Sequence, residues 1–586
     1  MRSSRHVFRL TAVLAALMIV VVAIFPASQS SAQSPPRKIL TGWIPYYAMK
    51  TALPSAVANG DLVKEVMPFW YTLKGATKIT DLYTPSNPSV PMAVPLTTMR
   101  DSGFQIIPTI TDGTDKLVLA KLLSVPATRT QVVRTITDLV TANNFDGIDL
   151  DFEGFAFTDG TTSWPATMVN WDAFIAELSA SLHALSKLLS ITTPVLFDPT
   201  TGKKGYYVYD WATISPMIDR LRIMTYDYST SSPGPIGPIT WAEQSVSYAV
   251  SVVAASKVYV GVPGYGRDWV TKVDGVCPSS VANVIVPGAK ATFVMRDAAD
   301  LASSYGAAPT YSASLAEVTF SYQKVYSGPS SNGLATSCTA SRTAWYQNAQ
   351  SYAVRAQLVA KYRLGGITAW TFGMEDPTAT DAVRQVAQAI APDQVDSTVV
   401  TDQNAVAYGS PVNIDGLFQL PDMTPIAGLA VRLELKETGE SVWRDILDAT
   451  TGPDGVVSTS LIIGKNAVLR FSSDATWERL ASESAEKTLA VGRLLNASPP
   501  ASAFAGLPFT FSGVVQPHEA GVPVALETIV AGKWQSVGKA VATDAAGQFT
   551  FSTIENVRGI ARYRINVAGN ENLQGVTSSI FAIVIY

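Results

Sequence analysis

The sequence predicts an α/β protein: a (β/α)8 TIM barrel with a small inserted α+β subdomain, followed by two immunoglobulin-like β-sandwich repeats. Short apolar strands alternate with helical stretches over residues 38–392. Beyond them the chain changes to short Val-, Thr- and Leu-rich strands with Gly and Pro turns, and one residue pattern occurs twice there. We therefore expect a barrel domain over 38–392 and sandwich repeats over 400–496 and 503–586.

A barrel of this class needs eight parallel strands, and eight candidates can be placed. They are Lys38–Pro45, Glu65–Tyr71, Phe104–Ile110, Gly147–Glu153, Leu189–Pro194, Leu221–Tyr226, Val258–Pro263 and Gly366–Phe372. Helical spacing of apolar residues indicates helices over Arg129–Ala142, Asp172–Lys187 and Tyr352–Tyr362. Short β-like pieces over Thr292–Ala344 predict the inserted subdomain, before the last helix and strand.

The two C-terminal repeats share residues at matching positions. The first repeat has Gly416, Gly428, Val431, Leu433 and Trp443. The second repeat has, at the corresponding positions and in the same order, Gly513, Gly521, Val524, Leu526 and Trp534. Each unit has the size of an immunoglobulin-like sandwich, and Ala497–Ala503 is the expected linker. Because the two tryptophans recur in register, we expect them in the cores. We favour a spacer role for the repeats over protein or carbohydrate binding.

Composition excludes several classes of function. With 586 residues, 47% of them hydrophobic and 15% charged, the chain is expected to be globular and to form two to four domains. A net charge of −4 gives no basic field for nucleic acid or an anionic membrane. Of three histidines only His183 lies in the barrel region, which argues against a Ser-His-Asp triad or a His-based zinc site there. We expect no metal and no other cofactor.

The first 32 residues have the pattern of a secretory signal peptide. Three arginines precede an uncharged apolar run over Leu10–Phe25, and Ser30-Ser31-Ala32 forms a small-residue cleavage site. We therefore expect residues 1–32 to be removed and the protein to be secreted. A retained N-terminal membrane anchor is the alternative, because the apolar run is long for a signal peptide.

The chain has two cysteines, Cys277 and Cys338. In an exported protein a single pair most simply forms one disulfide that closes a long surface loop. Two free, buried thiols are the alternative. The sequence therefore predicts a disulfide between them.

Four acidic residues share the eight positions from Asp146 to Glu153, with Asp149 and Asp151 between them. The residues that alternate with the last three acids are apolar, so in a strand these acids project from one face. A calcium loop would instead have polar residues and Gly between its ligands. Such a row of acids persists where the carboxylates share protons, pair with cations or do chemistry. We therefore predict a catalytic carboxylate array.

These residues resemble glycoside hydrolase family 18, the chitinase-like family. Asp146–Glu153 matches its Asp-Gly-x-Asp-x-Asp-x-Glu motif at every specified position, and Met224–Tyr228 matches its Met-x-Tyr-Asp-Tyr motif. Val262–Arg267 is similar to the segment that follows in the family, and Trp370 stands where the family has a tryptophan on the last strand. The resemblance covers roughly Ile39–Asp376.

Within the family, the chain is most similar to the bacterial branch of spore-cortex and cell-wall N-acetylglucosaminidases. Trp345–Asn348, Ala349–Ser351 and Leu364–Gly366 carry this similarity. One departure is clear: the family's Ser-x-Gly-Gly on the third strand is here Thr109-Ile-Thr-Asp112-Gly113. The departure affects the wall of the substrate site beside that strand.

The resemblance implies four catalytic residues and a substrate-assisted mechanism that retains the anomeric configuration. Glu153 would be the general acid, and the substrate's own 2-acetamido oxygen would be the nucleophile. Asp151 would bind the acetamido N–H, and Asp149 would share a proton with Asp151. Tyr226 would donate its hydroxyl to the acetamido oxygen.

The resemblance also implies the residues that contact the sugar. They are Asp146, Met224, Asp227, Tyr228, Trp370, Tyr265, Arg267 and Trp43. Trp370 would offer a flat apolar face at position −1, the sugar on the non-reducing side of the cleaved bond. Trp43 and Trp70 could pack in the core instead, and Arg267 could form a structural salt bridge.

The resemblance implies a secreted glycoside hydrolase of the chitinase or endo-β-N-acetylglucosaminidase type. Its expected substrate is a β-1,4-linked N-acetylglucosamine polymer, chitin or its oligomers, and we expect a monomer. Peptidoglycan is the alternative substrate, because it presents the same acetamido group. A non-catalytic chitin-binding lectin on the same barrel is the second alternative. Endo or exo action stays open.

Overall fold

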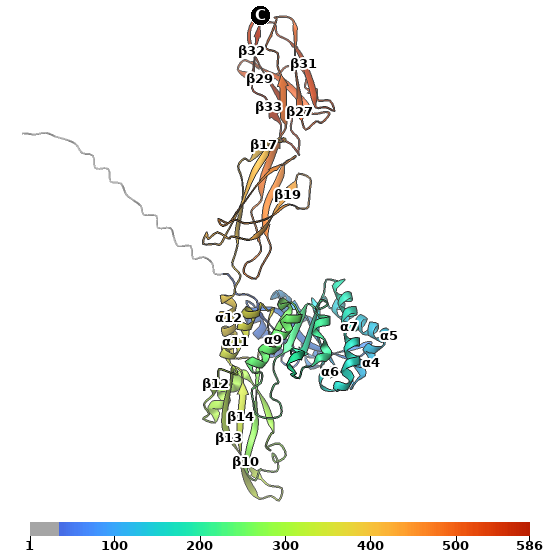
Figure 1. Ribbon diagram of the computed structural model, residues 1–586, viewed down its shortest axis with the longest axis vertical. Coiled ribbons are helices and arrows are strands. Elements are labelled where there is room, and N and C mark those ends of the chain that lie inside the picture. The colour runs from blue at the N-terminus through green and yellow to red at the C-terminus, as the bar shows by residue number, and fades with distance from the viewer. Residues whose placement is uncertain (1–33) are drawn as a thin grey trace, which may run out of the picture. The chain divides into compact units, whose positions relative to one another are not determined.

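A computed structural model describes residues 34–586. The predicted signal peptide, residues 1–32, lies outside the described residues and stays a prediction. Within residues 34–586, no helix combines the length and the apolar character that a membrane crossing requires. The described chain divides into two compact units (Figure 1). One consists of Ser34–Val395 with Ser472–Glu483, and the other of Asp396–Phe471 with Ser484–Tyr586.

Eight parallel strands form a closed barrel in the first unit. They are β1 (Leu40–Pro45), β2 (Val63–Gly75), β5 (Thr109–Asp112), β6 (Gly147–Asp151), β7 (Leu188–Pro194), β8 (Arg220–Met224), β9 (Val258–Pro263) and β15 (Gly366–Trp370). Each strand pairs with the next in this order, and β15 pairs with β1, which closes the ring. Two short strands, β3 (Lys78–Asp81) and β4 (Gln105–Ile106), also pair with β2. The predicted barrel and its eight strands are confirmed.

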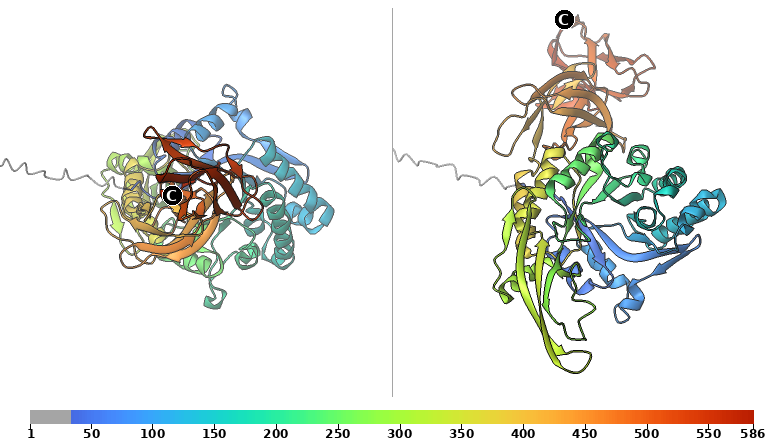
Figure 2. Two further views of the ribbon diagram at one scale, coloured as in Figure 1. Left: turned by 90° about the horizontal axis from the view of Figure 1, so that it is seen from above. Right: turned by 60° about the horizontal axis from the view of Figure 1, so that its bottom comes forward.

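Helices surround these strands (Figure 2). The longer ones are α1 (Met49–Ala58), α3 (Ala93–Asp101), α4 (Val118–Ser124), α5 (Pro126–Ala142), α7 (Trp164–His183), α9 (Ile239–Val252), α10 (Ala298–Ser304), α11 (Ala349–Tyr362) and α12 (Pro377–Ala389). Single turns form α2 (Tyr83–Ser86), α6 (Gly154–Phe157) and α8 (Trp211–Ile214). Side-chain caps set three of the starts, because Asp210 accepts from the Thr213 N–H, Asn348 from the Ser351 N–H and Asp376 from the Thr378 N–H.

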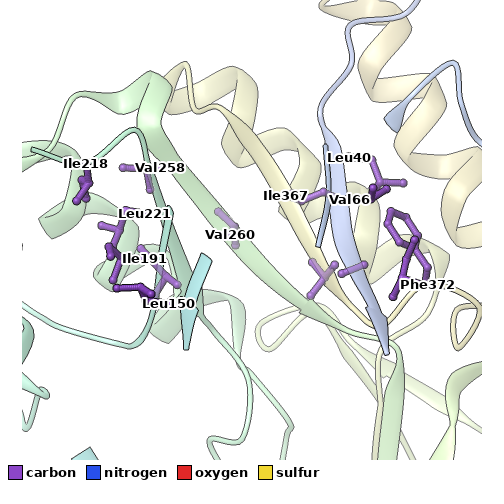
Figure 3. Packing of buried hydrophobic residues seen from close by; sticks show 14 of the residues in the cluster. Leu40, Val66, Leu150, Ile191, Ile218, Leu221, Val258, Val260, Ile367 and Phe372 are labelled. Carbon is purple, nitrogen blue, oxygen red and sulfur yellow. The ribbon is translucent and has the colours of Figure 1, made fainter. Parts of the chain in front are cut away.

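The main apolar core lies between the outer face of the barrel strands and the helices. Figure 3 shows part of this cluster, with labelled residues Leu40, Val66, Leu150, Ile191, Ile218, Leu221, Val258, Val260, Ile367 and Phe372. Leu150 is fully buried in this outer layer. Because side chains alternate along a strand, its neighbours Asp149 and Asp151 point into the barrel. Gly42 allows the chain to close here, since a Cβ would lie 2.8 Å from the Phe372 ring.

A five-stranded antiparallel sheet is inserted between β9 and α11, and its longer strands extend away from the barrel (Figure 1). It has the order β11 (Lys290–Val294), β10 (Tyr265–Gly275), β14 (Ala335–Tyr346), β13 (Glu317–Pro329) and β12 (Thr310–Ser312). The predicted start at Thr292 is too late, because β10 follows β9 after the single residue Gly264. A disulfide joins Cys277 and Cys338 within the insertion, as predicted.

The second unit contains two sandwiches with the same strand arrangement. The first pairs the sheet β16 (Asp396–Thr401), β18 (Pro411–Gln419) and β21 (Val456–Ile462) with a sheet of β17 (Ala405–Ala407), β24 (Lys487–Gly492), β22 (Ala467–Ser473), β19 (Ala430–Glu437) and β20 (Arg444–Thr450). Strand β23 (Ser482–Glu483) pairs with the last two residues of β22, and both pieces group with the first unit. The second pairs β25 (Leu494–Ser498), β27 (Pro508–Gln516) and β31 (Gln548–Ile554) with β26 (Ser502–Ala503), β34 (Phe581–Ile585), β32 (Gly559–Val567), β28 (Pro523–Val530) and β29 (Lys533–Ser536), edged by β30 (Val541–Ala542) and β33 (Val576–Thr577).

The repeated tryptophans do not lie in the sandwich cores, so that prediction is wrong. Trp443 and Trp534 are only partly buried. The Arg470 guanidinium lies 4.5 Å from the Trp443 ring centroid, and the Arg564 guanidinium lies 4.3 Å from that of Trp534. Both arginines also pair with a glutamate on the neighbouring strand. Recurrence in register therefore marks a repeated cation–π contact on the surface of each sheet.

Segment Ser472–Glu483 groups with the barrel although it belongs to the first predicted repeat. The guanidinium of Arg37 lies 4.0 Å from the Trp477 ring centroid and donates to the carbonyls of Ile390 and Trp477. Arg363 pairs with Glu478 at 2.6 Å. These contacts attach the segment to the beginning of the barrel chain and to its last helices.

Trp477→Ala should lower the stability of the barrel unit by about 1 kcal/mol, because it removes a cation–π contact and the apolar surface under it. Thermal unfolding followed by calorimetry measures the shift of the unfolding transition of the barrel unit. Trp443→Ala is the matched control, since it removes the same kind of contact from a sandwich. If Trp477→Ala shifts the same transition as Trp443→Ala, the attachment to the barrel is not significant.

Candidate active site

Strand β6 carries the acidic row into the barrel interior. The register pairs Thr109 of β5 with Asp149, and Asp149 with Ser190 of β7. The strand ends at Asp151, and Glu153 caps the short helix α6 that follows. The acids therefore rise from the interior toward the carboxyl ends of the strands, where barrels of this class build their sites.

Asp149 lies deepest, fully buried among hydroxyl groups. Its Oδ1 accepts from Ser190 at 2.6 Å, and its Oδ2 accepts from Thr109 at 2.8 Å. The Thr192 hydroxyl is 3.0 Å from both oxygens. The Arg222 Nε lies 3.9 Å from Oδ1. Both oxygens of this carboxylate therefore accept hydrogen bonds, and a cation lies nearby.

Asp151 and Glu153 lie in a different environment, with fewer donors. Asp151 is 6% exposed, and its Oδ1 has no hydrogen-bond partner among the described residues. Burial, and then the charges of Glu153 and Asp149, raise the pKa of Asp151 well above its ordinary value. Burial, and then the charge of Asp227, raise the pKa of Glu153 to about 7. Both acids therefore hold a proton more readily than ordinary carboxyl groups, and Glu153 can hold one near neutral pH.

Tyr226 and Asp227, after β8, form an aromatic and polar wall with Tyr265 and Arg267 of β10. Tyr226 packs with Tyr265, with ring centroids 6.3 Å apart. The Tyr265 hydroxyl donates to Asp227, and the Arg267 Nη1 lies 2.7 Å from the same carboxylate. Arg267 therefore forms a salt bridge with Asp227, which was the alternative to a substrate contact. Burial raises the pKa of Tyr226 well above its ordinary value, so its hydroxyl keeps its proton.

Trp370 at the end of β15 is partly exposed beside this wall. It meets Phe69 and Trp43 edge to face, with centroids 5.0 and 5.5 Å away. Trp43 is 1% exposed and donates its indole N–H to Thr109 at 3.0 Å. The buried position favours packing for Trp43, which supports Trp370 from below. Trp70 is also buried, against Tyr83.

Two other predicted contacts lie near the rim. Met224 is partly buried and packs against the cluster of Tyr226 and Tyr265. Tyr228 is 53% exposed and meets Trp241 edge to face at 5.3 Å. Both residues lie at the end of β8, close in sequence to Tyr226. Their contacts with a sugar stay predictions.

The predicted substrate contact of Asp146 is corrected by its position. Asp146 precedes β6 and therefore stands at the amino end of the strand, away from Glu153. Its Oδ2 accepts from the Ile106 N–H at 2.7 Å. The first acid of the motif thus satisfies a backbone donor of β4, and its role is structural.

Sequence reasoning missed an aromatic group beside the terminal acid. Phe157, at the end of α6, is 54% exposed, and its ring centroid lies 5.1 Å from that of Tyr206. Trp164 lies 6.2 Å from Tyr206. Burial, and then the charge of Glu153, raise the pKa of Tyr206. The spacing Glu153-Gly-Phe-Ala-Phe157 could have indicated Phe157, but only folding brings Tyr206 to it.

The departure from the family on the third strand places a carboxylate beside the acid. A Cβ at Gly154 would lie 2.6 Å from the Asp112 Oδ2, so this approach requires glycine. The other oxygen of Asp112 accepts from the N–H and the hydroxyl of Thr114. Burial raises the pKa of Asp112. Within residues 34–586, no group of three or more His, Cys, Asp or Glu is placed to hold a metal ion.

Comparisons with known proteins find relatives of the barrel part of this chain. A protein of Bacillus subtilis (strain 168) named as a sporulation-specific glycosylase, YdhD, is 27% identical over 256 residues, which are 43% of this chain and 53% of the relative. The cortical fragment-lytic enzyme of the same organism is 20% identical over 258 residues, or 44% and 53%. The chain thus spans about half the length of these relatives.

A crystal structure of a chitinase from Chromobacterium violaceum ATCC 12472 aligns with a TM-score of 0.48 and 25% identity, covering 60% of this chain and 98% of that chain. The family model for glycosyl hydrolases family 18 matches residues 70–375, more than half of the chain. This stretch runs from β2 through β15 and includes the acids on β6, so the chain belongs to glycosyl hydrolases family 18.

Proposed function

We propose that the protein is a secreted, retaining glycosidase that hydrolyses β-1,4 linkages in N-acetylglucosamine polymers. The observation that carries the proposal is the gradient along β6. Asp149 accepts hydrogen bonds at both oxygens, whereas the pKa values of Asp151 and Glu153 are raised, that of Glu153 to about 7. A carboxylic acid that keeps its proton near neutral pH at the open end of a barrel fits a general acid.

The reaction would begin with proton transfer from Glu153 to the glycosidic oxygen, while the acetamido oxygen of the substrate attacks the anomeric carbon. The bond to the leaving sugar breaks and an oxazolinium intermediate forms. Water then opens the intermediate and gives its proton back to Glu153, so the product retains the β configuration. Asp227 is poorly placed to replace this nucleophile, because its carboxylate is engaged by Arg267 and Tyr265.

Asp151 and Tyr226 would hold the acetamido group during this attack. The Asp151 Oδ1, without a partner among the described residues, can accept the acetamido N–H. Tyr226 can donate to the acetamido oxygen, because its raised pKa keeps the phenol protonated. Trp370 would support the −1 sugar. Phe157 and Tyr206 would line the side from which the leaving sugar departs, since they adjoin Glu153.

Chitin and its oligomers are the proposed substrate, and peptidoglycan is the second candidate. The names of the two relatives, a sporulation-specific glycosylase and a cortical fragment-lytic enzyme, favour the second candidate. Both polymers contain the acetamido group that the mechanism uses. Incubation with purified chitin oligomers and with peptidoglycan, followed by product masses, separates the two. Binding without any product from either polymer would indicate a lectin instead.

Glu153→Gln should abolish turnover while the fold and oligosaccharide binding are kept. Loss of a general acid costs on the order of 10²–10⁴-fold in rate. Initial rates on N-acetylglucosamine oligomers, with calorimetric binding as the control, measure both effects. A variant that keeps more than about a tenth of the activity would remove Glu153 from the role of acid.

The activity should fall as the pH rises through about 7, because Glu153 must be protonated and its pKa lies there. Asp227→Asn removes a negative charge that raises this pKa, so the basic limb of the kcat/KM profile should move to lower pH. Asp146→Asn is the matched control, since this carboxylate lies at the other end of β6. An unmoved basic limb in Asp227→Asn would contradict the assignment.

A glucose oligomer with hydroxyl in place of acetamide should be inert, because it lacks the nucleophile and the group that Asp151 binds. A thiazoline that mimics the cyclised intermediate should inhibit, as a ligand resembling the transition state. Proton NMR during early turnover of an N-acetylglucosamine oligomer should show the β-anomer first. Initial α-anomer, or efficient cleavage of the glucose oligomer, is incompatible with the proposed mechanism.

A further inference from the structure

A buried ionic network lies in the barrel beneath the acidic row. Arg222 of β8 is completely buried, and its Nη2 lies 2.5 Å from Glu65 of β2. Its Nη1 donates to Thr41 at 2.8 Å, and its Nε donates to Ser190 at 3.0 Å. Arg220 pairs with the other oxygen of Glu65 at 2.7 Å. A charge taken this far from water is unfavourable unless it is paired and fully hydrogen-bonded.

The network orients hydroxyl protons toward Asp149. Arginine and tryptophan side chains can only donate, so the Ser190 oxygen accepts from Arg222 and the Thr109 oxygen accepts from Trp43. Each hydroxyl then has one proton left, and both lie within 2.8 Å of Asp149. The two chains of donors therefore require an acceptor at Asp149, which the ionised carboxylate provides.

The cations of this interior lie around Glu65 and Asp149, and no ion pair of the described residues reaches Asp151. Arg220, Arg222 and the partly exposed Lys64 lie within 4 Å of Glu65, and Arg222 also lies 3.9 Å from Asp149. Burial alone would raise the pKa of Glu65, but the two arginines lower it below its ordinary value. A second ionised aspartate at Asp151 would leave a buried negative charge without a partner.

We propose that Arg222 is a positioning residue that keeps Asp149 ionised and thereby keeps the proton of the aspartate pair on Asp151. The inference rests on the proposed function and extends it. Arg222 does not touch the substrate. It acts through Ser190, whose hydroxyl it directs, and through its own charge 3.9 Å from Asp149. Glu65 and Thr41 fix the guanidinium in the orientation that this requires.

The groups that face Arg222 and Asp149 come from most of the barrel strands. The titratable and charged ones are Lys64 and Glu65 from β2, Asp151 and Glu153 from β6 and its end, Arg220 and Tyr226 from β8 and its end, and Tyr259 from β9. Strands β1, β5 and β7 contribute hydroxyls, those of Thr41, Thr109, Ser190 and Thr192. Arg222 is thus the cation nearest to Asp149 in this set.

A double-mutant cycle tests the coupling without any activity measurement. Arg222→Met should lower the Tm of the full-length protein by roughly 5 °C, because it leaves Asp149 charged and unpaired. Asp149→Asn added to Arg222→Met should recover part of this loss. If Asp149→Asn does not recover the Tm of Arg222→Met, while Glu65→Gln in the same background does, Arg222 stabilises Glu65 alone and the proposal is overturned. This outcome stands whether or not the protein is active.

The pH profile tests the consequence for the proton. A cation favours the ionised form of a neighbouring carboxylate, so its removal raises the pH at which the pair gains a second proton. In Arg222→Met the acid limb of kcat/KM should therefore move to higher pH, by about one to three pH units. Arg222→Lys keeps the positive charge, so its acid limb should lie close to the wild-type pH. An acid limb that stays at the wild-type pH in Arg222→Met contradicts the proposal.

Two further variants keep the test decisive. Arg342→Met also removes a buried arginine with a carboxylate partner, Asp268 at 2.6 Å, but in the inserted sheet. It should lower the Tm without moving the acid limb. If Arg222→Met does not fold, Ser190→Ala is the substitute test. It removes the hydroxyl that links Arg222 to Asp149, and the acid limb of kcat/KM should move in the same direction by a smaller amount. A limb unmoved in Ser190→Ala then overturns the proposal.

Discussion

The cost of placing carboxylates inside a closed barrel is the constraint on which the rest of the structure depends. Asp149 and Asp151 point inward because Leu150 between them is needed in the outer apolar layer. Once inside, each acid must be ionised with donors around it or neutral with its proton. Asp149 has donors at both oxygens, whereas burial and the neighbouring carboxylates raise the pKa of Asp151. The contrast arises because only one of them lies against Arg222 and the hydroxyls of the neighbouring strands.

This constraint explains why polar residues occupy strands that otherwise read as apolar. Thr109 of β5 and Ser190 and Thr192 of β7 direct their hydroxyls at Asp149, and Glu65 and Arg222 complete the network below. Removing one partner of a buried pair costs about 3–5 kcal/mol, so these residues are linked in stability as well as in chemistry. The same interior both stabilises the barrel and sets the protonation of the acids at its mouth.

Local patterns were sufficient to predict the barrel and the order of the acids, because strand period and motif spacing are properties of neighbouring residues. Contacts between distant segments were not predictable in this way. Arg222 meets Glu65 across 157 positions of sequence, and Tyr206 reaches Phe157 only in the folded chain. Asp146 was misassigned because a motif gives residue types but not which strand end each residue occupies. Trp443 was misassigned because recurrence in register does not distinguish a core position from a repeated surface contact.

The departure from the family motif on the third strand changes the wall of the site but keeps a hydrogen-bond donor for Asp149. Thr109 supplies a hydroxyl that accepts from Trp43 and donates to Asp149, so this position still supports the deepest acid. Three residues on, Asp112 adds a carboxylate beside Gly154. Burial raises the pKa of Asp112. The departure therefore changes the wall that a sugar would meet, while the support of the acidic row is kept.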